Sequence, residues 1–72
     1  MEPTVCKTRQ RLEDLAQHHL RELAALAHEE AEILKSGDEE RILAVDKKIE
    51  NTLGQKERVI GALQEHRKEH GC

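Results

Sequence analysis

Apolar residues recur at helical spacing along the first half of the chain. No glycine or proline interrupts residues 4–35, and at about 100° per residue the apolar positions cluster around one direction. The apolar positions are Val5, Leu12, Leu15, Ala16, Leu20, Leu23, Leu26, Ala27, Ile33 and Leu34. The pattern predicts a helix over residues 4–35, with an apolar face too wide for a single neighbouring helix.

A second apolar stripe, with spacings of three, four or seven residues, predicts a helix over residues 39–70. The stripe consists of Ile42, Val45, Ile49, Leu53, Ile60 and Leu63. Gly54 and Gly61 lie inside this helix, and each costs up to about 1 kcal/mol relative to alanine. Three interpretations are open: two tolerated glycines, a groove where another helix approaches closely, or a break at Gly54.

The tripeptide 36–38, Ser-Gly-Asp, separates the two helical segments. Gly37 suits the left-handed conformation that ends many helices. The second helix begins either with Ser36 as cap and Glu39 three residues on, or with Asp38 as cap. The sequence therefore predicts an all-α fold, an antiparallel two-helix hairpin with its turn at residues 36–38.

A lone hairpin of 72 residues without Phe, Tyr or Trp has little core, and its apolar groove stays open along its length. We expect a second copy to close the groove and form a homodimeric four-helix bundle. With Ile33 opposite Ile42, residues that face each other in the hairpin have numbers adding up to about 75. The predicted interface core is Leu12, Leu23, Leu26, Ile33, Ile42, Ile49, Leu53, Ile60 and Leu63.

Charge is distributed unevenly between the two ends of the predicted hairpin. Around the turn, residues 28–40 carry six acidic side chains and one base, Lys35. Basic residues are in excess at the open end, namely Lys7, Arg9, Arg11, Arg67 and Lys68. Copies packed antiparallel place the acidic turn of one against the basic end of the other, which favours an antiparallel dimer.

Three polar residues fall on the apolar stripes. His19 faces Lys56 in the predicted register, near the middle of the hairpin, and Glu30 also points inward. They are either solvated or satisfied polar positions, or a buried polar layer that sets register and oligomeric state. A ligand such as haem at His19 is a third alternative. The i,i+4 pair His18–Glu22 is interpreted as surface support for the helix.

Two cysteines and two histidines converge on the open end. His66 and His70 are four residues apart, with Cys72 two residues later and Cys6 at a similar height on the first helix. These side chains match the ligand inventory of a tetrahedral zinc site. A disulfide and two unpaired thiols are the alternatives, and a reducing cytosol weighs against the disulfide.

The sequence weighs against several classes of function. The sequence shows no base placed to activate a hydroxyl nucleophile, and no glycine-rich phosphate loop. We therefore do not expect an enzyme. A net charge of −3 without aromatic residues disfavours nucleic acid. No apolar run reaches the length of about 20 residues that spans a bilayer, and no signal-peptide pattern is present, so we expect a cytoplasmic protein.

The segment 30–40, Glu-Ala-Glu-Ile-Leu-Lys-Ser-Gly-Asp-Glu-Glu, is followed by Lys47-Lys48, Glu57-Arg58 and Arg67. This arrangement resembles the first hairpin of the FlgN-type flagellar export chaperones. The resemblance implies an all-α binding protein that masks an amphipathic helix of an export substrate in an apolar groove. It transfers no catalytic residue.

Taken together, these patterns predict a small non-enzymatic helical hairpin that self-associates and mediates protein–protein interaction as a structural or adaptor module. The alternatives are an export chaperone of the FlgN type and a zinc-binding mini-domain.

Overall fold

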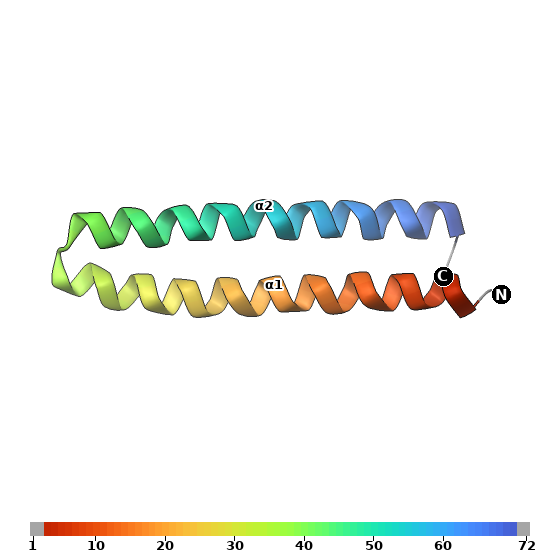
Figure 1. The fold of residues 1–72 in the computed structure, drawn as a ribbon, viewed down its shortest axis with the longest axis horizontal. Helices are drawn as coiled ribbons and strands as arrows, with labels where there is room; N and C mark the ends of the chain where they lie inside the picture. The colour runs from red at the N-terminus through yellow and green to blue at the C-terminus, as the bar shows by residue number, and fades with distance from the viewer. Residues whose placement is uncertain (1–2, 71–72) are drawn as a thin grey trace.

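The computed structural model consists of two long antiparallel helices joined by one tight turn, and it describes residues 3–70, with the side chains of residues 7–70. Helix α1 spans Pro3–Ser36 and helix α2 spans Glu39–His70. They lie side by side in a rod of 54 × 14 × 12 Å, with the start of α1 and the end of α2 at the same end (Figure 1). The predicted all-α pair of packed helices is confirmed. Helix α1 is one residue longer at each end than predicted.

The turn is closed by short-range hydrogen bonds from two side chains. Asp38 caps α2, because its Oδ1 accepts from the Arg41 amide at 3.3 Å and its carbonyl accepts from the Ile42 amide at 3.0 Å. The Ser36 hydroxyl donates to the Ile33 carbonyl at 2.6 Å and accepts from the Asp38 amide at 3.3 Å. Of the two candidate caps, Asp38 therefore begins α2, and Ser36 completes the end of α1.

Gly37 is the residue that makes this tight turn sterically easy. Its φ is +71°, in the left-handed region, and a Cβ added there meets nothing within 4 Å. The cost of a side chain at this position is therefore conformational and not a clash. We expect Gly37→Ala to lower the free energy of unfolding by about 1 kcal/mol, as measured by urea unfolding followed by circular dichroism.

Gly61→Ala is the matched control for this prediction. Gly61 lies inside α2 with ordinary helical φ, and an added Cβ there also meets nothing within 4 Å. Alanine is the better helix former, so this variant is expected to gain up to about 1 kcal/mol. Stability changes of opposite sign are the expected result. A loss of stability in both variants would contradict the conformational role assigned to Gly37.

The least exposed side chains follow an alternating spacing of three and four residues on both helices. This spacing is typical of the contact stripe between two coiled helices. We call these positions the seam. On α1 they are Arg9, Leu12, Ala16, His19, Leu23, Leu26, Glu30 and Ile33. On α2 they are Ile42, Val45, Ile49, Thr52, Lys56, Val59, Leu63 and His66.

The core along the seam is thin. Its buried apolar members are Ala16, Ile33, Val45 and Val59, and no large side chain of the described residues is fully buried. The radius of gyration is 16.2 Å, whereas a compact domain of this length has about 11 Å. A rod of this shape leaves much of its apolar surface in water.

The structure also changes three details of the predicted second stripe. Helix α2 is continuous from Glu39 to His70, so the predicted alternative of a break at Gly54 is wrong. Thr52 and Val59, which the stripe did not include, are buried in the seam. Leu53 lies outside the seam and is 37% exposed, and Ile60 lies outside it as well. The Thr52 hydroxyl tolerates burial because it donates to the Lys48 carbonyl at 2.9 Å.

Candidate functional site

One side of the seam carries a run of apolar residues on both helices, and an ion pair shows which positions lie on that side. Arg67 on α2 reaches Glu13 on α1, with 3.8 Å between the guanidinium and the carboxylate. Residues seven apart lie on the same face of a helix. Positions at steps of seven residues from Glu13 on α1 and from Arg67 on α2 therefore lie on this side of the seam. We define the leucine flank as the apolar residues at these positions. They are Leu20, Ala27 and Leu34 on α1, and Ile60 and Leu53 on α2.

The leucine flank is open to solvent. Leu20 is 50% exposed, Leu34 is 56% exposed and Leu53 is 37% exposed. Ala24 and Ala31, also exposed, continue the three–four spacing between the two leucines of α1. Helix α1 therefore carries two apolar stripes, and α2 covers only one of them. This explains the wide apolar face that the sequence indicated.

The opposite side of the seam is polar and carries complementary charges. Glu22 and Glu29 lie on α1, and Arg41, Lys48 and Gln55 lie on α2. Two shallow grooves follow this side, of about 410 and 190 Å³, and Lys48 lines both. Acidic positions on one helix facing basic positions on the other favour the antiparallel pairing of α1 with α2. We call this side the polar flank.

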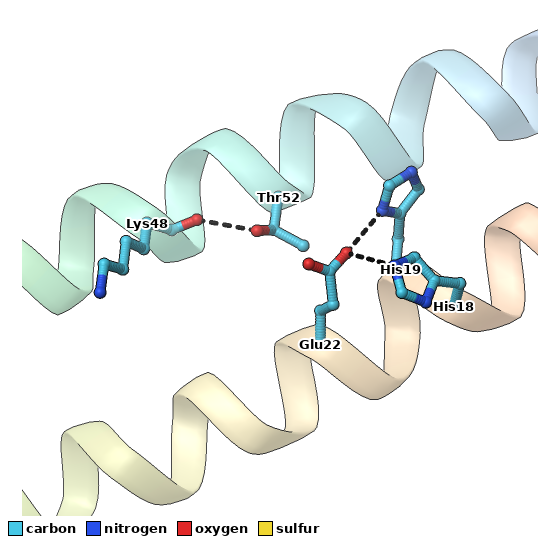
Figure 2. Close-up of polar contacts among 5 residues, drawn as sticks. All are labelled: His18, His19, Glu22, Lys48 and Thr52. Carbon is cyan, nitrogen blue, oxygen red and sulfur yellow. Dashed lines mark hydrogen bonds and ion pairs between the residues drawn. The ribbon is translucent and has the colours of Figure 1, made fainter.

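A cluster of two histidines and one carboxylate lies beside the polar flank near the middle of the rod (Figure 2). Glu22 Oε1 is 2.9 Å from His19 Nδ1 and 3.4 Å from His18 Nε2. The His19 side chain is only 11% exposed, whereas those of His18 and Glu22 are 64% and 42% exposed. One carboxylate oxygen is thus shared between a buried imidazole and an exposed one.

The three residues of the predicted polar layer all occupy seam positions. His19 is buried at 9% exposure, and Glu30 and Lys56 are half-buried. The smaller groove is lined by Ile33 together with Arg41 and Val45, consistent with the register that places Lys56 across from His19. His19 Nδ1 is engaged by Glu22, which satisfies one of the ring nitrogens within α1.

The predicted zinc ligands are only partly within the described residues. His66 and His70 lie together, with ring centroids 4.8 Å apart. Among the described residues, the buried Nε2 of His66 has no hydrogen-bond partner. The Cys6 side chain and all of Cys72 lie outside the part of the chain that is described. The four-ligand zinc site at the open end stays a prediction.

The cluster of His18, His19 and Glu22 was not predicted from the sequence, where only the i,i+4 pair of His18 with Glu22 was identified. The signal that identifies the cluster is the additional i,i+3 spacing from His19 to Glu22, because both spacings bring side chains together on a helix.

Comparison of the chain with protein-family models, with curated proteins and with solved structures finds no match. Within the described residues, neither helix is both long and apolar enough to cross a membrane. The function must therefore be inferred from the surfaces of the hairpin.

Proposed function

We propose that this protein is a non-enzymatic helical hairpin that self-associates through its leucine flank and serves as a structural or adaptor module. The observation that carries the proposal is the second apolar stripe of α1, which continues onto α2 through Leu53 and Ile60. The stripe has the spacing of a helix-packing surface, yet Leu20, Leu34 and Leu53 are 37–56% exposed in the single hairpin.

The thin core of the hairpin supports a second copy as the occupant of this flank. Small domains without staples rarely gain more than about 3–5 kcal/mol from a single core. Each large aliphatic side chain contributes about 1.5–3 kcal/mol when it moves fully out of water. A two-fold symmetric interface buries the same patch on both copies, so every leucine of the flank counts twice. Dimerisation thus supplies the core that one hairpin lacks.

Charge specifies the relative orientation in the proposed dimer. A two-fold axis perpendicular to the rod, midway between Leu20 and Ala27, sets Gly37 of one copy level with Gln10 of the other. The acidic turn then lies beside Arg9 and Arg11. The parallel arrangement places the two acidic turns together, and the like charges repel. We therefore propose an antiparallel four-helix bundle.

The test is sedimentation of the full chain over a concentration series, with and without reductant. A reductant-independent dimer at micromolar concentration is the expected result. A monomer throughout the series contradicts the proposal. A dimer seen only without reductant also contradicts it, because Cys6 or Cys72 would then account for the association.

A second candidate function uses the same flank with a different occupant. The stripe of Leu20, Ala24, Ala27, Ala31 and Leu34 is a surface on which an amphipathic helix of another protein can pack. The resemblance to the FlgN-type export chaperones favours this alternative. A monomer that binds an amphipathic helical peptide, and loses this binding when Leu20 is replaced by glutamine, would support the chaperone.

A further inference from the structure

We propose that His18, His19 and Glu22 form a binding site for a divalent transition-metal ion of the Zn²⁺ type. The site lies beside the polar flank, on the side of the seam away from the leucine flank. It uses neither the cysteines nor the histidines of the open end, and it does not depend on self-association.

Two of the three distances between the donor atoms are close to those expected around one bound metal ion. Two ligand atoms bound to a tetrahedral Zn²⁺ lie about 3.3 Å apart, because each is about 2.0–2.1 Å from the ion. Glu22 Oε1 lies 2.9 Å from His19 Nδ1 and 3.4 Å from His18 Nε2, on either side of this value. All three donor atoms lie within 4.8 Å of one another. We expect a side-chain rotation at His18 to bring the three donor atoms to coordination distance.

Two of the three ligands, His19 and Glu22, are already held in place, and the third, His18, can change its rotamer. The His19 ring is held by burial in the seam, and the Glu22 carboxylate already bonds to it. The His18 side chain is 64% exposed, so it can rotate, and the ion has a path from solvent. Binding requires that the donor nitrogens carry no proton, so affinity is expected to fall as the pH is lowered.

The donor types select the kind of ion. Two imidazole nitrogens and one carboxylate oxygen suit Zn²⁺, Ni²⁺ or Cu²⁺, whereas Ca²⁺ and Mg²⁺ prefer all-oxygen sites. Three protein ligands leave a coordination position for water. The positive charge of Lys56, across the seam from His19 in the register, opposes a dication. We therefore expect weaker binding than at a four-ligand structural zinc site.

The decisive experiment is a Zn²⁺ titration of the reduced full chain, with the side-chain nitrogens of each histidine resolved by NMR. The expected result is a joint, saturable shift at His18 Nε2 and His19 Nδ1. His28 is the internal control, because it has Glu32 at i+4 but no adjacent histidine. No saturable response at His18 and His19 overturns the proposal, whether or not His66 and His70 respond.

A pair of matched variants tests the carboxylate. Glu22→Gln is expected to weaken Zn²⁺ binding at His18 and His19 by at least about tenfold, whereas Glu32→Gln leaves it unchanged. Unchanged circular dichroism shows that the helices remain folded. If Glu22→Gln keeps the original affinity, the carboxylate is not a ligand and the three-residue site is wrong. Sedimentation of the same variants reports separately on the dimer, so the two proposals can fail independently.

Discussion

Replacement of Ile33 by alanine is expected to unfold most of the isolated hairpin at room temperature. Ile33 is 5% exposed and belongs to a core of only four buried apolar residues. Truncation of a buried isoleucine to alanine costs about 2–5 kcal/mol, as lost burial plus the cavity left behind. This is comparable to the total of about 3–5 kcal/mol that a small core supplies. Urea titration followed by far-ultraviolet circular dichroism measures the loss in the free energy of unfolding.

Leu43→Ala is the matched control for this prediction. Leu43 lies in the part of α2 close to the turn, as Ile33 does in α1, but it is 69% exposed. A surface substitution of this kind usually changes stability by less than about 0.5 kcal/mol. Equal losses in Ile33→Ala and Leu43→Ala would show that the core does not lie along the seam.

Lys56→Leu provides a third comparison, since an apolar residue at this half-buried seam position is expected to raise stability.

The helices and the turn could be predicted from the sequence because their signals are local. Uninterrupted apolar spacing indicated each helix, and Gly37 between them marked the turn. The choice between Ser36 and Asp38 as cap needed the structure, because both side chains have suitable chemistry. The structure assigns a hydrogen bond to each: Asp38 Oδ1 accepts from Arg41, and the Ser36 hydroxyl donates back to Ile33.

The position of the seam on α2 was harder to predict, because at two neighbouring positions the apolar residue is not the buried one. Leu53 is the more apolar residue, yet Thr52 has the spacing that continues the seam. A threonine can be buried there because its hydroxyl is satisfied within its own helix. Leu53 then falls on the leucine flank. A residue that is apolar but outside the seam is thus a sign of a second contact surface.

The candidate sites were predictable to different degrees. The inward position of His19 follows from its place on the apolar stripe of α1. Its contact with Glu22, and the sharing of that carboxylate with His18, depend on side-chain rotamers that spacing alone does not determine. The width of the apolar face pointed to a second neighbour, but α1 alone could not show which half of the face α2 would cover.

The double substitution Leu20→Gln with Leu53→Gln is expected to abolish the dimer and leave the hairpin folded. Both leucines are partly exposed in the single hairpin, so replacing them lowers the free energy of unfolding of the hairpin only slightly. In the proposed symmetric interface the change removes four half-exposed leucines, at about 1 kcal/mol each. The dissociation constant should therefore rise by about three orders of magnitude. Sedimentation across a concentration series measures the shift.

Leu15→Gln is the control that makes this result specific to the leucine flank. Leu15 is 42% exposed, within the range of the flank leucines, but it lies on the polar flank with Glu22 and Glu29. We expect this variant to dimerise as the unmodified protein does, with the same helical content. A dimer that survives the double substitution but is lost on Leu15→Gln would place the interface on the polar flank. That result would contradict the proposed function and also place the cluster of His18, His19 and Glu22 beside the interface.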